Sequence, residues 1–192
     1  METGLIIGAD EFFGLTLCEY MMKEGIQVDI SCPHAQTGQN KILIEERMMW
    51  LGRNDLIRVI DIEDGKESYD LIFIQTEEPN KRQVDIKARK GKYRIVLDGA
   101  EDDTLEHNEP VIVLPRMFGP WTLNQERRTY QEHSFYVEDV AEALVKWTIH
   151  ADQRQEETHH LMVDRQTDEK QAEKKIAEWE RHYSTFFDKN QE

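Results

Sequence analysis

The sequence has little of three features that mark special classes of protein. Only two of its 192 residues are cysteines, Cys18 and Cys32, which excludes a disulfide framework and a four-thiolate metal site. Basic residues are outnumbered by acidic ones, 24 against 39, and the formal charge of −15 opposes binding to nucleic acid or anionic lipid. No apolar run approaches the roughly 20 residues that span a bilayer, and no cleavable leader precedes the first apolar segment. We therefore expect a cytoplasmic protein with neither nucleic-acid nor membrane partners.

What the sequence does contain is enough apolar material for one core. Hydrophobic residues make up 39% and charged residues 33% of the chain, as in soluble globular proteins. The length suits one domain and leaves little room for a second. We predict a single NAD(P)-binding Rossmann-like domain over residues 1–187, followed by a disordered acidic tail over residues 188–192.

Short apolar runs alternate with helical patterns along the chain. The predicted strands are Gly4–Ile7, Val28–Ile30, Ile57–Ile60, Leu71–Ile74, Arg94–Leu97 and Val111–Leu114, with a further strand-like piece at 160–163. Nearly continuous apolar strands separated by helices are typical of a parallel sheet covered on both faces. The sequence thus predicts the α/β class: a Rossmann-type, doubly wound parallel sheet in a single, shortened domain.

Four helices are predicted from residues that recur at helical spacing. The first helix follows the first strand and ends at Gly25, and the second ends near Leu51. The other two cover residues 137–150 and 168–187. The apolar positions assigned to the second helix are Ile42, Ile44, Met48, Trp50 and Leu51. The apolar stripe of the last helix is expected to pack against the domain.

The first strand leads directly into a glycine-containing turn and then a helix. Gly8 and Gly14 bracket this turn, and Phe12 and Phe13 precede the second glycine. Glycine lets the backbone approach a pyrophosphate, and a helix N-terminus favours negative charge. The turn therefore predicts a dinucleotide phosphate site.

Together with four further segments, this turn resembles the NAD-dependent epimerase/dehydratase family, which are extended short-chain dehydrogenases. The segments, in the order of the family, are 61–64, 69–73, 116–120 and 135–143. The resemblance implies NAD or NADP as cofactor, held by Gly8, Phe12, Phe13, Gly14, Asp61 and Ile62. It places Arg116, Gly119 and Pro120 on the substrate side.

The catalytic groups of that family are missing from the sequence. The family uses a Tyr and a Lys four positions later, and no tyrosine here has a lysine at that spacing. Only the acidic stretch 101–110 lies where the family has its catalytic helix. Glu11 replaces the central glycine of the turn, and Cys32 stands where an acid would hold the ribose hydroxyls; Asp29 lies three residues too early. We predict no catalytic residue.

Other charged and metal-binding patterns have simple interpretations. His159 and His160 are neighbours in a predicted strand and point to opposite faces, so we predict no metal site. Arg116 would bind a phosphate or carboxylate, or else form a salt bridge to surface acids. The basic cluster is expected on a solvated helix face, or where an acidic partner or a second copy docks: Lys81, Arg82, Lys87, Arg89, Lys90 and Lys92.

The leading hypothesis is a catalytically inactive relative of the epimerases, kept as an interaction or regulatory module with at most weak nucleotide binding. Its partner would be another protein or a second copy of the chain. The first alternative is an NAD(P)-dependent epimerase, dehydratase or reductase that uses replacement groups such as Asp98 or Tyr136. The second is a nucleotide-occupied sensor without chemistry.

Overall fold

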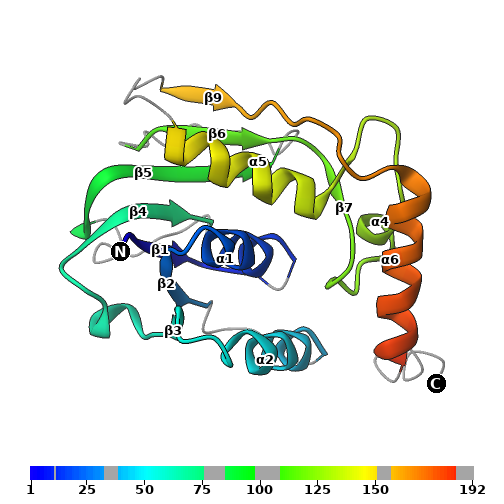
Figure 1. Ribbon diagram of the computed structural model, residues 1–192, viewed down its shortest axis with the longest axis horizontal. Helices are drawn as coiled ribbons and strands as arrows, with labels where there is room; N and C mark the ends of the chain where they lie inside the picture. Colours follow the sequence, from blue (N-terminus) through cyan, green and yellow to red (C-terminus); the bar gives the residue numbers. More distant parts are fainter. Residues whose placement is uncertain (11, 33–38, 76–84, 98–108, 151–156, 185–192) are drawn as a thin grey trace.

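A seven-stranded parallel sheet forms the centre of the protein (Figure 1). The computed structural model describes residues 1–10, 12–32, 39–75, 85–97, 109–150 and 157–184. The strands of the sheet are β1 (Thr3–Ile7), β2 (Gln27–Ser31), β3 (Ile57–Val59), β4 (Ser68–Ile74), β5 (Lys87–Leu97), β6 (Val111–Leu114) and β9 (Thr158–His160). They lie in the order β3-β2-β1-β4-β5-β6-β9, and every neighbouring pair is parallel. The order reverses between β1 and β4, which creates the topological switch point of a Rossmann-like domain. The predicted fold class is confirmed.

Three helices pack on one face of the sheet: α1 (Phe13–Lys23), α2 (Gln39–Leu51) and α5 (Val137–His150). Their apolar side chains meet alternate strand residues, among them Ile6, Val28 and Phe73. The residues between these, such as Leu5 and Ile72, face the other side and are buried there around the short helix η1 (Ile62–Asp64). This two-faced burial explains why the strand sequences are apolar almost without interruption.

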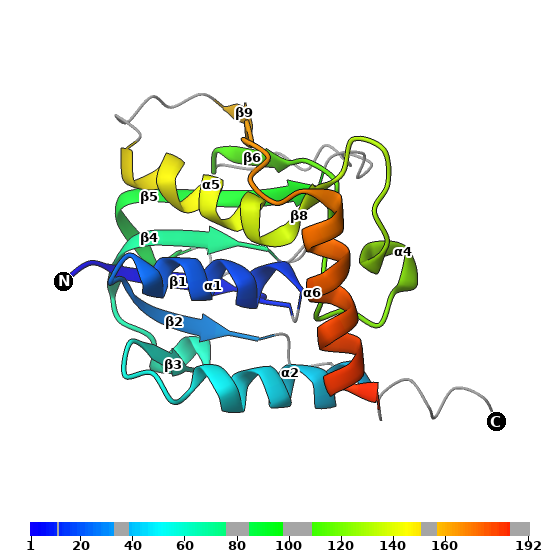
Figure 2. The same cartoon turned by 45° about the vertical axis from the view of Figure 1, so that its right-hand side comes forward.

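The last third of the chain builds a layer at the carboxyl ends of the strands. It comprises the two-stranded sheet of β7 (Met117–Phe118) and β8 (Phe135–Tyr136) and the helices α4 (Gln125–Arg128) and α6 (Glu169–His182). In both views α6 runs across the carboxyl ends of the strands toward α2 (Figures 1 and 2). Asp168 caps α6 by accepting a hydrogen bond from the amide of Gln171 at 2.9 Å. The crevice at the switch point is therefore flanked by this C-terminal layer.

Most elements begin and end close to their predicted positions. The helix predicted over residues 137–150 is α5 with the same bounds. Helix α1 ends at Lys23, two residues before Gly25, whose φ of 76° suits glycine. The strand-like piece predicted at 160–163 was misplaced, because the register with β6 ends at His160. The tail 188–192 lies outside the described residues.

The interpretation of α2 was wrong in part. Ile42 and Trp50, assigned to its apolar face, are 48% and 60% exposed. Ile44 and Leu51 are buried as predicted, and Leu43 and Arg47 face the domain with them. The charged Arg47 lies on the buried side because polar groups there neutralise it, as described below.

No helix in the described part of the chain is both long and apolar enough to cross a membrane.

Candidate functional site

The turn between β1 and α1 has the backbone geometry of a phosphate turn. Gly8 has a φ of 77°, a left-handed conformation that suits glycine. The amides of Gly8 and Ala9 donate to the carbonyl of Ser31 at 2.8 and 3.2 Å, which joins the turn to the end of β2. A Cβ on Gly14 would lie 2.6 Å from the Cα of Ala9, so helix and strand approach as closely as glycine allows. Both predicted glycines therefore have the positions that the resemblance implies.

Asp10 fills the N-terminus of α1 with a carboxylate from the protein itself. Its Oδ1 accepts hydrogen bonds from the amides of Phe13 at 2.8 Å and Gly14 at 2.7 Å, and its carbonyl accepts one from Leu15 at 3.0 Å. These amides are the groups with which a helix N-terminus binds an external anion. In this protein they are already engaged by an internal one.

Arg47 holds the first turn of α1 from the side of α2. Its side chain is 1% exposed, and its Nη1 donates to the carbonyl of Phe12 at 3.2 Å. Its Nη2 donates to Thr16 Oγ1 and to Glu19 Oε1, both at 2.8 Å. Thr16 Oγ1 also donates to the Phe12 carbonyl at 2.5 Å. This buried network fixes the backbone of the turn in its present conformation.

An aromatic cluster covers Arg47 from the C-terminal layer. The guanidinium lies 5.0 Å from the ring centre of Trp121, which in turn lies 5.8 Å from Trp179 and 5.0 Å from Tyr183. Trp121 has a φ of 66°, which a bulky L residue adopts only where surrounding contacts hold it. Phe12 is 3% exposed, and the guanidinium of Arg127 lies 5.8 Å from its ring centre. Aromatic and basic side chains of the C-terminal layer thus lie against Arg47 and Phe12.

The remaining predicted cofactor residues are divided between the surface and the core. Asp61 is exposed just after β3, whereas Ile62 is buried in the apolar cluster on the second face of the sheet. Cys32 follows β2, and burial together with the nearby charge of Asp10 raises the pKa of its thiol to about 11, so it stays neutral. Asp29, which lies three residues earlier, is inaccessible and binds Arg58.

The predicted substrate-side residues serve mainly to pack the C-terminal layer. A Cβ on Gly119 would lie 2.5 Å from Val137 Cγ1, and Pro120 is buried beside it. Arg116 is exposed, and its side chain forms no ion pair with any residue in the described ranges. The salt bridge expected for Arg116 is therefore not found among these residues, since its side chain points to solvent.

Tyr136 was the replacement catalytic group of the first alternative. It is 1% exposed, and its hydroxyl donates to Glu138 at 3.4 Å. Burial and the charge of Glu138 raise the pKa of Tyr136 far above its usual value. The ammonium of Lys175 lies 4.8 Å from the Tyr136 ring centre and binds Glu138 at 2.9 Å. A tyrosine in this setting does not release its proton near neutral pH. Asp98, the other replacement group, lies outside the described residues.

His159 and three members of the basic cluster form contacts within the protein. His159 stacks on Trp147 with ring centres 4.5 Å apart, and the described residues contain no group of three or more potential metal ligands. Lys81 and Arg82 of the basic cluster lie outside the described residues. The other four members of the cluster were wrongly assigned to a helix face, since they lie on β5, which pairs with β4. Three of its members form ion pairs, with Asp70, Glu2 and Glu109.

Sequence reasoning missed the residues that decide the state of the site. The sequence pattern did not indicate that Asp10 accepts amides of α1 or that Trp121 lies over Arg47. The one available signal for Arg47 was its place among Leu43 and Leu51, four residues away on either side, on the buried side of a helix. A charged residue at such a position implies a buried partner.

Comparison with known proteins identifies one relative and many structures of the same fold. No family model matches the chain. It is 37% identical over 194 residues to the uncharacterized protein YjaV of Bacillus subtilis (strain 168), which covers 98% of this chain and 100% of YjaV.

Solved structures similar to the chain are NAD-dependent epimerases and reductases. The UDP-glucuronic acid 4-epimerase of Bacillus cereus in complex with NAD superposes with a TM-score of 0.61 at 15% identity, over 83% of this chain and 76% of that one. The vestitone reductase of alfalfa superposes with a TM-score of 0.61 at 9% identity, over 96% of this chain and 99% of that one. At these identities the likeness establishes the fold, in agreement with the resemblance drawn from the sequence.

Proposed function

The chain belongs to the family of YjaV from Bacillus subtilis and has the fold of the NAD-dependent epimerases and reductases, and from this premise we propose that it is a catalytically inactive Rossmann domain. In this proposal it acts in the cytoplasm by binding another protein chain and does not transfer hydride. The observation that carries the proposal is the carboxylate of Asp10, which accepts the amides of Phe13 and Gly14.

The residues of the turn, as folded, do not fit a dinucleotide pyrophosphate. A pyrophosphate would need the amides that Asp10 holds, and it would meet the negative charge of that side chain a few ångströms away. Arg47, which could neutralise an anion, is already bound to Glu19 and covered by Trp121. The sequence places a second carboxylate, Glu11, at the central glycine position of the same turn.

The absence of the Tyr and Lys pair of the epimerase/dehydratase family supports the same proposal. No Tyr-x-x-x-Lys exists in the sequence. The raised pKa of Tyr136 keeps its hydroxyl protonated near neutral pH, so it cannot accept a proton there. The enzyme alternative would therefore have to work without Tyr136 as its proton acceptor. The sensor alternative is favoured by one observation, the retained geometry of Gly8 and Gly14, and the titration below tests it directly.

We expect the purified chain to show no binding of NAD, NADH, NADP or NADPH in isothermal titration. A variant with Asp10→Gly and Glu11→Gly frees the amides and removes both charges, so it is expected to bind with a Kd of about 1 mM or below. The matched control is Asp10→Asn, whose amide oxygen can still accept from both amides and should keep the site closed. Circular dichroism checks that each variant folds.

Binding by the unmodified chain with a Kd below about 10 µM would contradict the proposal and favour the sensor or enzyme. Turnover of any nicotinamide cofactor in the presence of nucleotide sugars would leave only the enzyme. If Asp10→Asn gained binding as well as the double variant, charge and not occupation of the amides would be what excludes the cofactor.

A further inference from the structure

The outward face of α2 carries an apolar stripe. Ile42, Met49 and Trp50 are 48%, 63% and 60% exposed and recur at helical spacing on one side of the helix. Large apolar side chains gathered on one exposed face mark an interaction surface more often than isolated ones do. Since the buried side of the same helix already packs on the domain, this second apolar side has no role in the fold.

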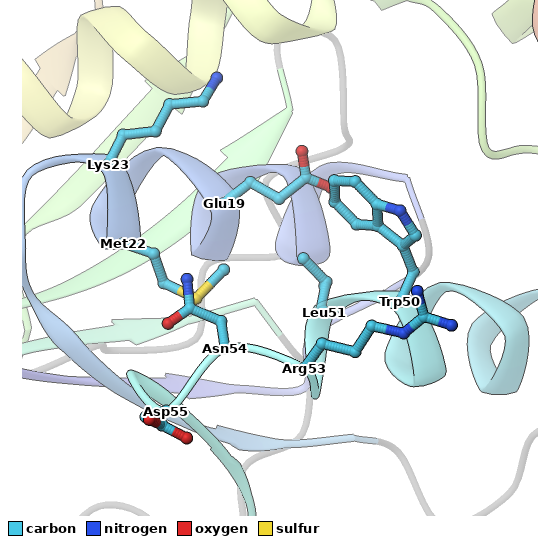
Figure 3. Close-up of a pocket in the computed structure, with 8 residues that line it drawn as sticks. All are labelled: Glu19, Met22, Lys23, Trp50, Leu51, Arg53, Asn54 and Asp55. Atoms are coloured by element: carbon cyan, nitrogen blue, oxygen red, sulfur yellow. The ribbon is translucent and has the colours of Figure 1, made fainter.

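Two hollows adjoin this stripe. One, of about 520 Å³, lies between α1 and the end of α2 and is lined by Met22, Trp50, Leu51 and Arg53 among others (Figure 3). The other, of about 500 Å³, lies along α2 itself beside Ile42 and Met49. Both hollows are shallow and open to solvent, and exposed apolar side chains stand directly beside them.

We propose that this face of α2 joins two copies of the chain through a twofold axis near Met49. An isologous interface requires a surface that is complementary to itself, with knobs and hollows on the same patch. The α2 face meets this requirement. The inference rests on the proposed function, because a domain that works by binding needs a binding surface, and it names the partner as a second copy.

The charges of the face fit a second copy packed antiparallel. Glu45 lies four residues before Met49 in α2, and Arg53 lies four residues after it, in the turn that directly follows the end of α2 at Leu51. A twofold axis near Met49 brings Glu45 of each copy toward Arg53 of the other. Arg53 forms no ion pair with any residue of the described ranges. Glu45 has only a weak exposed pair with Lys41 at 3.7 Å. A partner of one charge sign would satisfy only half of this pattern.

The experiment is sedimentation equilibrium of the full chain and of charge-reversed variants. We expect the chain to dimerise, and Arg53→Glu and Glu45→Arg each to weaken the dimer at least about tenfold, because like charges then meet across the axis. Combining both changes restores the opposite pairs, so the double variant should return toward the affinity of the unmodified chain. Met49→Lys should also give monomers.

The two single variants control for net charge. Each chain carries −15, so two copies repel, and Arg53→Glu increases this repulsion while Glu45→Arg reduces it. Loss of the dimer in both therefore points to the local pair. A monomeric chain at about 100 µM, a dimer insensitive to either single change, or a double variant no better than the singles would each overturn the proposal.

Titration of the Arg53→Glu variant with the four nicotinamide cofactors separates this inference from the proposed function. Cofactor binding by the variant would overturn the inactive-module proposal and leave the dimer standing. A monomeric chain that binds no cofactor would overturn the dimer and leave the other proposal, with a different protein as partner.

Discussion

Replacing Arg47 by alanine is expected to lower the free energy of unfolding by about 3 kcal/mol. The side chain is 1% exposed and donates to the Phe12 carbonyl, Thr16 and Glu19, and alanine would leave these acceptors without their donor. Glu19 is 21% exposed and regains some water, which keeps the loss at the low end of the range for broken buried pairs. Urea denaturation followed by circular dichroism measures the change.

Two variants make the Arg47 result specific. Arg47→Lys keeps the charge but cannot reach the three acceptors with one planar group, so about half of the loss is expected. Lys41→Ala on the same helix removes only an exposed pair, and its effect should stay within about 0.5 kcal/mol. If Arg47→Ala fell in that narrow range too, the network would not be what holds the turn closed.

Replacing Asp29 by alanine is expected to cost about 3 kcal/mol and to change how stability responds to acid. Asp29 is inaccessible, and its two oxygens accept hydrogen bonds from Arg58 Nε at 2.8 Å and Nη2 at 2.6 Å. The Tyr69 hydroxyl donates to the same carboxylate at 2.7 Å and is itself buried. Alanine therefore breaks a bidentate ion pair and removes the acceptor of the Tyr69 hydroxyl proton, although the hydroxyl still accepts a hydrogen bond from the Lys66 amide at 2.9 Å.

The pH dependence follows from the pKa of Asp29. Burial by itself would raise this pKa, but the hydrogen bonds from Arg58 and Tyr69 outweigh burial and lower it below the usual value. A carboxyl with a lowered folded-state pKa stabilises the fold above its unfolded pKa of about 4, and this contribution is lost as the pH falls through the folded-state pKa.

Asp29→Asn tests this dependence with little change in shape. The difference in unfolding free energy between the unmodified chain and Asp29→Asn should be constant from about pH 5 to pH 8 and shrink below about pH 4. Denaturation curves at these pH values give the difference. A gap that stays the same at low pH would mean that the Asp29 carboxyl has the same pKa in the folded and unfolded states, and the ion pair with Arg58 would then not stabilise the fold.

The Asp10 carboxylate in the turn and the absence of a Tyr-x-x-x-Lys pair both support the proposed lack of catalysis. A Rossmann domain normally binds its ligand at the carboxyl ends of the strands, where the order of the sheet reverses. In this chain Asp10 fills the anion site from within, and Trp121 covers Arg47 from the C-terminal layer. Under the proposed function, the outer faces of the helices are the surfaces available for binding a partner.

The fold could be predicted from the amino-acid sequence. Segments such as Leu71–Ile74 are apolar at every position, because a central parallel strand is buried on both faces whatever its neighbours are. The turn glycines were predictable for a similar reason, since a left-handed φ at Gly8 and close packing at Gly14 admit no other residue.

Two features depend on the tertiary structure: which group accepts the amides of the turn, and which side of α2 is buried. An apolar period of a helix shows that one side is buried, but it does not show whether Arg47 or Trp50 lies there when both sides carry large side chains. That choice depends on partners distant in sequence, because a buried guanidinium is stable only where acceptors such as Glu19 surround it. The role of Asp10 likewise depends on the distance between its carboxylate and the amides of Phe13 and Gly14, and local sequence does not fix that distance.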